Sequence, residues 1–126
     1  MKTIHVVAAI IEQDRRVLAT QRGYGEFEGG WEFPGGKIES GETEEEALIR
    51  EIHEELNAQI TVNRHFCTVN YDYESFYLHM ECYLCTLTES HIDLLEHNQA
   101  RWLDKETIDS VSWLPADITI IEALKK

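Results

Sequence analysis

The stretch GKIESGETEEEALIREIHEELNA, residues 36–58, decides the fold that the sequence predicts. It leads from a turn-forming glycine into the clearest helix of the chain, predicted over residues 43–56. Thr43 followed by Glu46 matches a capping box, and the run of glutamates that starts the helix places negative charge where the helix dipole favours it. Asn57 stands where a helix commonly ends in a left-handed residue. One apolar face toward a core is predicted from residues at helical spacing: Leu48, Ile52 and Leu56.

A cluster of carboxylates lies on the same helix. At 100° per residue, Glu51, Glu54 and Glu55 fall on neighbouring parts of its surface. Carboxylates held that close raise one another's pKa unless a cation intervenes, and hard oxygen ligands suit Mg²⁺ or Mn²⁺. A solvated acidic helix face is the alternative, and for an arbitrary glutamate-rich helix it is the better one. The glycine- and aromatic-rich loop at residues 23–36, directly in front of the helix, favours the metal site here.

The combination resembles the Nudix box, which reads Gly, five residues, Glu, seven residues, then Arg-Glu-apolar-any-Glu-Glu-any-Gly-apolar. The matching residues are Gly36, Glu42, Arg50, Glu51, Glu54 and Glu55. Asn57 replaces the final glycine and Ala58 is a weak apolar residue, but both follow the carboxylates. Residues 31–37 and 114–118 look like the MutT-type branch of the family. The resemblance implies a single Nudix domain over residues 1–126, with the box at residues 36–58.

The resemblance also implies roles for the box residues. Glu54 and Glu55 would coordinate divalent cations, Mg²⁺ with Mn²⁺ as a substitute, and the Gly35 carbonyl would complete the inner shell. Glu51 would act as a ligand or as the base that activates water. The expected catalytic set is therefore Arg50, Glu51 and Glu54, with Arg50 orienting the glutamates. Glu96 is a further metal ligand candidate by a looser alignment, and a plain surface loop is the alternative.

Candidate substrate contacts lie outside the carboxylates. Arg22 and Lys37 flank the glycine loop and are candidates for phosphate, with a solvated charge as the alternative. Phe33 is expected to stack on a nucleobase or to pack in the core, and Phe76 to line the pocket or the core. Asp117 opens the predicted final helix, where the MutT-type resemblance implies a polar residue that contacts the base; a simple favourable charge at the helix N-terminus is the alternative. An ionised aspartate only accepts hydrogen bonds and would select an edge rich in N–H donors, as in guanine, 8-oxoguanine or cytosine.

The rest of the chain predicts a mixed sheet between helices, an α+β domain of the α/β/α sandwich type. Strands are predicted over residues 3–11, 16–21, 60–73, 76–87 and 100–103, with hairpins between the first two and around residues 74–75. A final helix is expected to begin at Pro115. Its inward-facing residues are expected to be Ile118 and Ile121, with Leu124 or Ile120.

Composition narrows the function classes. The 126 residues carry a formal charge of −13, which argues against a grip on a nucleic-acid polymer and against docking on an anionic membrane. No stretch is long enough to predict a membrane span or a signal segment, so a cytoplasmic location is expected. The three cysteines do not form a disulfide framework, and Cys82 and Cys85 are expected on opposite faces of a strand. All three are expected to be buried structural thiols.

The resemblance to the Nudix family implies an enzyme. We expect Mg²⁺-dependent hydrolysis of a (deoxy)nucleoside triphosphate to monophosphate and pyrophosphate by a monomer or homodimer, with 8-oxo-dGTP or a cytidine-type triphosphate as substrate. One alternative is a Nudix hydrolase of another nucleoside diphosphate derivative, such as ADP-ribose, a nucleotide sugar or a dinucleoside polyphosphate. A second alternative is a non-catalytic Nudix module that binds nucleotides.

Overall fold

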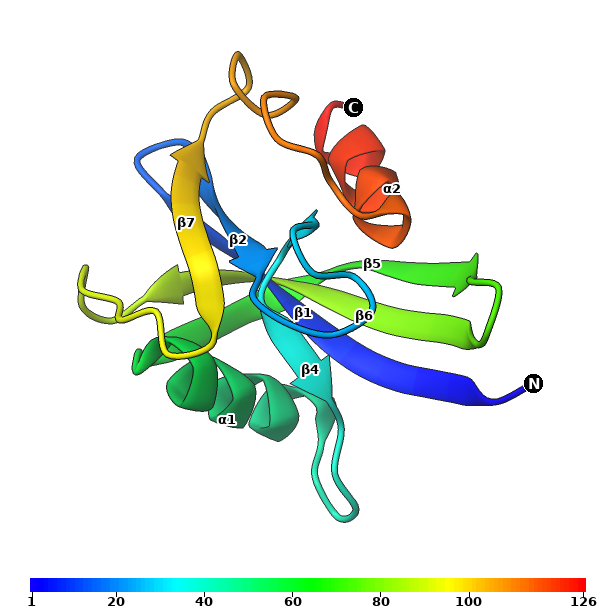
Figure 1. Ribbon diagram of the computed structural model, residues 1–126. Helices are drawn as coiled ribbons and strands as arrows, with labels where there is room; N and C mark the ends of the chain where they lie inside the picture. The colour runs from blue at the N-terminus through cyan, green and yellow to red at the C-terminus, as the bar shows by residue number, and fades with distance from the viewer.

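The computed structural model describes residues 1–126, and Figure 1 shows a twisted sheet with one helix on each side. The elements follow in the order β1 (Thr3–Gln13), β2 (Arg16–Arg22), β3 (Trp31–Glu32), β4 (Gly35–Lys37), α1 (Glu44–Leu56), β5 (Ile60–Asp72), β6 (Tyr77–Leu87), β7 (His97–Leu103) and α2 (Pro115–Leu124). No helix reaches the length and apolar character that a membrane crossing requires.

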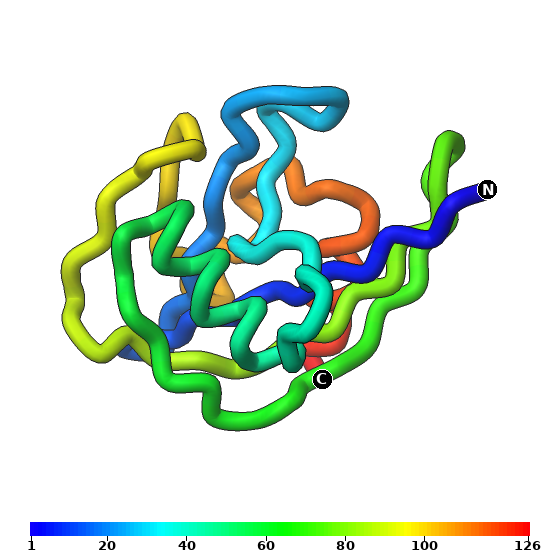
Figure 2. Tube along the Cα trace, turned by 90° about the horizontal axis from the view of Figure 1, so that it is seen from below, coloured from blue at the N-terminus to red at the C-terminus, as the bar shows by residue number.

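Strand β1 organises the sheet. It pairs in parallel with β6 from Thr3 to Ile11, and β5 pairs antiparallel with the far edge of β6. On its other side β1 pairs antiparallel with the short β4 and, at its end, with β2. Strands β7 and β3 flank β2. The N-terminal end of β1 therefore lies beside the tip of the β5–β6 hairpin (Figure 2). The predicted mixed sheet and both predicted hairpins are confirmed.

Alternation along β1 separates two layers of core. Val7, Ala9 and Ile11 pack against α1, whereas Ala8 and Ile10 belong to the cluster that contacts α2. This is the pattern expected of a strand buried on both faces, with successive side chains pointing to opposite sides. The helices consequently cover opposite faces of one sheet, and the predicted α/β/α arrangement is confirmed (Figure 1).

The local signals of α1 are confirmed. Thr43 caps the helix through its hydroxyl, which accepts from the Glu46 N–H, and the Glu46 carboxylate accepts from the Thr43 N–H in return. Asn57 ends the helix in the left-handed conformation with φ 49° and ψ 43°. The predicted apolar residues of this helix are all buried: Leu48, Ile52 and Leu56.

The prediction for α2 is partly wrong. Ile118 is 44% exposed, whereas Ile120 and Ile121 are buried. The helix turns Ala116 and Asp117 toward the sheet, and Ile120 and Ile121 follow on that face at helical spacing. Ile118 then points outward. An aspartate on the inner face is the feature that a hydrophobic pattern does not anticipate.

Pairing between strands also creates or lengthens elements that the sequence does not predict in full. Strand β7 begins at His97, three residues before the predicted start, because the polar residues at its head pair with β2 down to Arg22. The loop at residues 23–36 contains the short strands β3 and β4. Cys67 is only half-buried, so the prediction of three buried thiols is wrong at this position.

Candidate active site

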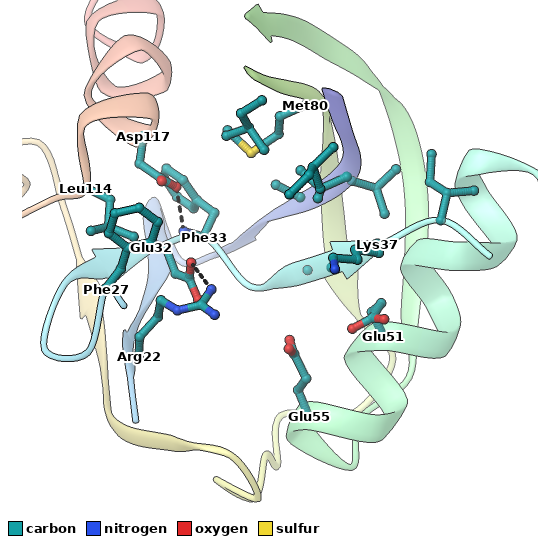
Figure 3. Close-up of a pocket in the computed structure, with 18 of the residues that line it drawn as sticks. Arg22, Phe27, Glu32, Phe33, Lys37, Glu51, Glu55, Met80, Leu114 and Asp117 are labelled. Atoms are coloured by element: carbon teal, nitrogen blue, oxygen red, sulfur yellow. Dashed lines mark hydrogen bonds and ion pairs between the residues drawn. The ribbon is translucent and has the colours of Figure 1, made fainter. Parts of the chain in front are cut away.

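A cavity with a volume of about 690 Å³ lies beside α1 and β4 and is also lined by residues of β1, β6 and α2. Glu51 and Glu55 from α1 lie at one end, and Asp117 from α2 lies at the other with Phe27 and Leu114 (Figure 3). This volume is in the range of small-molecule sites. The cavity thus joins a carboxylate end to a largely apolar end in a single space.

Close packing of β4 sets the carboxylate end. Gly35 and Gly36 pair with Ala8 and Val7 of β1. A Cβ at Gly35 would lie 2.0 Å from the Val7 carbonyl oxygen, and a Cβ at Gly36 would lie 2.3 Å from Oε2 of Glu51. The backbone beside Gly35 leaves no room for a side chain, and a Cβ at Gly36 would displace the Glu51 carboxylate, so the pair brings bare backbone against that carboxylate.

Arg50 ties the loop before α1 to the helix. Its Nε donates to Oε2 of Glu42 at 2.6 Å, and its Nη1 donates to Glu51 at 2.8 Å and to Glu54 at 3.0 Å. Nη2 donates to the Lys37 carbonyl at 3.0 Å. The hydrogen bond to Glu42 is the main reason that the pKa of Arg50 is raised. Arg50 therefore holds two of the three carboxylates of the predicted site.

Glu54 sits differently from its neighbours. Its side chain is 53% exposed and outside the lining of the cavity, whereas Glu51 is 15% exposed and lines it. The structure shows no group of three or more Asp, Glu, His or Cys side chains in a metal-holding arrangement. The carboxylates predicted as ligands therefore share one helix end but are not gathered around one point.

Glu55 carries the strongest indication of a missing counter-charge. Burial, followed by the charges of Glu51, Glu32 and Glu96, raises its pKa to about 9. Its Oε1 is buried and has no hydrogen-bond partner. Burial also raises the pKa of Glu51, with Arg50 opposing the shift. A carboxylate that has a buried, unpartnered oxygen and lies among other carboxylates fits a hard divalent cation.

Glu96 reaches this region from the loop before β7. Backbone N–H groups of the loop cap the end of α1, with Asp93 donating to the Leu56 carbonyl at 2.8 Å and Leu95 to the Glu55 carbonyl at 3.1 Å. A small cavity of about 30 Å³ lies there, lined by acidic and basic groups that include Glu32, Glu55, Glu96, Arg22 and His97. Tyr24 Oη donates to Oε1 of Glu96 at 3.2 Å.

Asp117 occupies the apolar end. It is 5% exposed, and its Oδ1 accepts from the Phe33 N–H at 3.0 Å. Burial raises the pKa of Asp117 well above its ordinary value, with the Phe33 N–H opposing the shift. From the sequence alone, Asp117 is expected to be ionised and therefore only to accept hydrogen bonds. The buried environment instead favours the neutral acid, which can also donate a hydrogen bond.

An aromatic wall completes the apolar end, and most of it was missed by sequence reasoning. Phe27 lies 4.8 Å from Tyr73 between ring centroids, and Tyr73 lies 5.2 Å from Phe76, the one member that the sequence singled out. Phe33 is buried and stacks on Trp113 with centroids 4.9 Å apart, so one of its faces is already occupied. The aromatic residues at the tip of the β5–β6 hairpin and in the glycine loop are the sequence signal from which this wall could have been predicted.

The remaining candidates divide between cavity and surroundings. Arg22 and Lys37 both line the cavity, and Arg22 Nη1 pairs with Oε1 of Glu32 at 3.2 Å. Glu32 and His97 were not predicted as site residues. Only the pairing of their strands with β2 brings them to the site, and the sequence carries no local pattern for that pairing. The cavity brings together the following predicted residues: Arg22, Phe33, Gly35, Lys37, Glu51, Glu55, Phe76 and Asp117. It does not include Arg50, Glu54 or Glu96.

The family model described as NUDIX domain matches residues 1–125. The chain belongs to the Nudix family. Among curated proteins, this Nudix chain is 35% identical over 124 residues to a CTP pyrophosphohydrolase of Escherichia coli, covering 98% of this chain and 92% of that protein. It is 37% identical over 87 residues to an 8-oxo-dGTP diphosphatase of Proteus vulgaris, covering 68% and 78%.

A solved structure supports the same fold. The crystal structure of a MutT Nudix hydrolase from Burkholderia pseudomallei superposes with a TM-score of 0.85 at 24% identity, covering 98% of this chain and 99% of that one. The chain is therefore a MutT-type Nudix hydrolase that acts on phosphorus-containing anhydrides. Nudix hydrolases act on small nucleotide substrates and generally use divalent cations such as Mg²⁺.

Proposed function

We propose that this Nudix hydrolase cleaves a (deoxy)nucleoside triphosphate to monophosphate and pyrophosphate with Mg²⁺, and that its substrate is 8-oxo-dGTP or a cytidine-type triphosphate. One observation carries the proposal. A single cavity has the Glu51 and Glu55 carboxylates at one end and Asp117 with an aromatic wall at the other. A phosphate chain and a nucleobase require these two ends at once.

The carboxylate end supports metal-assisted hydrolysis. Glu51 and Glu55, with Glu54 after a side-chain turn toward the cavity, would hold the cation together with the Gly35 carbonyl. A bound Mg²⁺ neutralises phosphate oxygens and makes a water acidic enough to attack at neutral pH. Arg50 would keep Glu51 and Glu54 in place through the hydrogen bonds that it donates to both. Glu51 faces the cavity. In this proposal it would act either as a ligand of the cation or as the base that takes the water proton.

Binding of the phosphates is the harder task for a chain with a formal charge of −13. Arg22 and Lys37 are the only lysine or arginine residues that line the cavity. Arg22 is already paired with Glu32, so we assign Lys37 the freer contact with phosphate oxygens. Most of the charge compensation then falls to divalent cations, which is consistent with the unpartnered Glu55.

Base recognition is proposed at Asp117. Its Oδ1 is used by the Phe33 N–H, which leaves the second carboxyl oxygen for the base. As a neutral acid it can offer one O–H donor beside an acceptor, a pairing that suits the edges of both 8-oxoguanine and cytosine. The names of the two relatives, an 8-oxo-dGTP diphosphatase and a CTP pyrophosphohydrolase, support the same two substrates. Phe27, Tyr73 and Phe76 would pack against the base.

The decisive experiment identifies both products. Purified protein with Mg²⁺ is incubated with normal and oxidised nucleoside triphosphates, ADP-ribose, a nucleotide sugar and a dinucleoside polyphosphate. We expect monophosphate and pyrophosphate from 8-oxo-dGTP or CTP. We expect Glu54→Gln to lower kcat by about 10²-fold or more with the fold intact, because a metal ligand is lost. Glu45→Gln, an exposed glutamate on the same helix, is the matched control and should retain activity.

Three outcomes would overturn parts of this proposal. Release of orthophosphate and a nucleoside diphosphate would place the attack at a different phosphorus. Turnover confined to ADP-ribose, the sugar or the dinucleotide would assign the alternative substrates. Binding without any turnover would indicate a nucleotide-binding module.

Asp117→Asn tests base recognition separately. The amide keeps an acceptor for the Phe33 N–H but always presents an N–H₂ donor, so we expect the order of kcat/KM values across the nucleotides to change by about tenfold for at least one base. The Mg²⁺ concentration dependence should stay as in the wild type, because the residue lies at the far end of the cavity. An unchanged nucleotide order would remove Asp117 from base recognition.

A further inference from the structure

Two of the three cysteines face each other outside the active site. Cys67 of β5 is the direct partner of Cys82 of β6, and the next pair, Thr68 with Glu81, continues the same register. Directly opposite residues of antiparallel strands have Cα atoms about 4.5–5.5 Å apart. Disulfides form at Cα separations of about 4.4–6.8 Å. The backbone therefore already holds this pair at bridging distance.

The two side chains also point the same way. Both belong to the apolar layer between the sheet and α2, Cys82 as a buried member and Cys67 packed against it. The two thiols are close enough for each to shift the pKa of the other. Cys85 lies on the opposite face of the sheet, in the layer beneath α1, and cannot reach them. The structure thus supplies one close thiol pair and one isolated thiol.

The members of the pair differ in exposure and acidity. Cys67 is half-buried, whereas Cys82 is fully buried. The neighbouring Cys82, with the nearby His65 assisting against burial, lowers the pKa of Cys67. Cys67 and burial raise the pKa of Cys82. Cys67 is therefore the thiol that carries thiolate character and that solvent can reach.

We propose that Cys67 is a site of oxidation by hydroperoxides and that Cys82 resolves the oxidised form into a reversible disulfide between β5 and β6. The Cys67 thiolate attacks a peroxide oxygen, the O–O bond breaks, and the sulfur is oxidised to sulfenic acid while the departing hydroxide or alkoxide takes up a proton from solvent as water or alcohol. The Cys82 sulfur then attacks the Cys67 sulfur. The S–O bond breaks and water leaves with the Cys82 proton. A dithiol reductant restores both thiols.

The position of the bridge connects it to the cavity. Met80 precedes Cys82 by two residues on the same strand face, and its side chain lines the cavity. Cys82 shares its apolar cluster with Ala116, the neighbour of Asp117 in α2, so the α2 end of the cavity is close to the pair. Oxidation would therefore change the packing directly behind the proposed base site. It would not touch the carboxylates at the other end.

The test uses the whole protein and hydrogen peroxide. After a short treatment and alkylation of remaining thiols, intact mass spectrometry and a non-reducing peptide map are recorded. We expect a mass loss of two hydrogen atoms, one alkylated thiol at Cys85, a linked peptide pair containing Cys67 and Cys82, and full reversal by dithiothreitol. A linkage through Cys85, a disulfide between two chains, or over-oxidation of Cys67 with Cys82 still reduced would overturn the proposal.

Three variants sharpen the result. Cys85→Ser, the matched control, should form the bridge as the wild type does. Cys67→Ser should lose it, and Cys82→Ser should leave a Cys67 sulfenic acid that dimedone captures. A bridge in Cys67→Ser, or no dimedone adduct in Cys82→Ser, would contradict the assigned order of events. If a core variant does not fold, the wild-type peptide map decides alone. None of these readouts depends on catalytic activity.

Discussion

Glu55 and Glu81 show how environment alone separates two glutamates of one chain. Glu55 is half-buried beside other carboxylates with one oxygen buried and unpartnered, and its pKa is raised to about 9. For Glu81, burial alone would raise the pKa, but hydrogen bonds from Thr68, His65 and His79 outweigh it and lower the pKa to about 2. The first carboxylate lacks a counter-charge, whereas hydrogen bonds from neighbouring side chains stabilise the charge of the second.

The satisfied carboxylate leads to a pH prediction. Because the folded pKa of Glu81 lies below its value in the unfolded chain, the stabilisation it provides is present above about pH 4.5 and is lost as the pH falls toward about 2. Glu81→Gln should therefore lower the free energy of unfolding at pH 7 by about 1–2 kcal/mol, a figure reduced for solvent screening. The difference from the wild type should shrink as the pH falls through this window. Urea denaturation at several pH values measures it.

Glu89→Gln, an exposed loop glutamate, serves as the control for that measurement. It should leave the free energy of unfolding unchanged at every pH. A Glu81→Gln penalty that stays constant from pH 7 to about pH 3 would show that the side-chain shape, and not the charge, provides the stabilisation.

Helix α1 carries both the fold signal and the carboxylates, and its two ends have different tasks. The capping box at Thr43 fixes where the helix begins, and thereby which residues face the core and which face the cavity. At the other end Asn57 adopts φ 49°, and its Nδ2 donates to Asp93 Oδ2 at 2.9 Å. Asn57 thus replaces the glycine of the Nudix pattern and also binds the loop that carries Glu96.

Two substitutions separate these roles of Asn57. Asn57→Ala and Asn57→Gly both lose the hydrogen bond to Asp93, but only alanine pays the steric cost of a left-handed backbone. We expect Asn57→Ala to be less stable than Asn57→Gly by about 1 kcal/mol in urea denaturation. Equal free energies of unfolding would mean that the helix end relaxes out of the left-handed conformation when the side chain is removed.

At the scale of the whole molecule, the sheet assembles a site from segments far apart in sequence. Glu51 and Glu55 come from α1, Lys37 from β4, Arg22 from β2 and Asp117 from α2. The formal charge of −13 predicts poor binding to polyanions, and only two basic side chains line the cavity. The binding of divalent cations that we propose at the carboxylate end would resolve this conflict, because the positive charge that phosphates need would not be part of the polypeptide.

The sequence by itself determined α1 with both caps, the glycine pair, the carboxylates of the box and the sandwich of two helices around a mixed sheet. These features depend on contacts within a few residues or on periodic burial, and both are written in the local pattern. Only the tertiary structure decided that Glu54 lies outside the cavity while Glu55 lines it, that α2 turns Asp117 inward and Ile118 outward, and that Cys67 meets Cys82. Those outcomes depend on strand register, bulges and helix rotation, which are set by packing among distant segments.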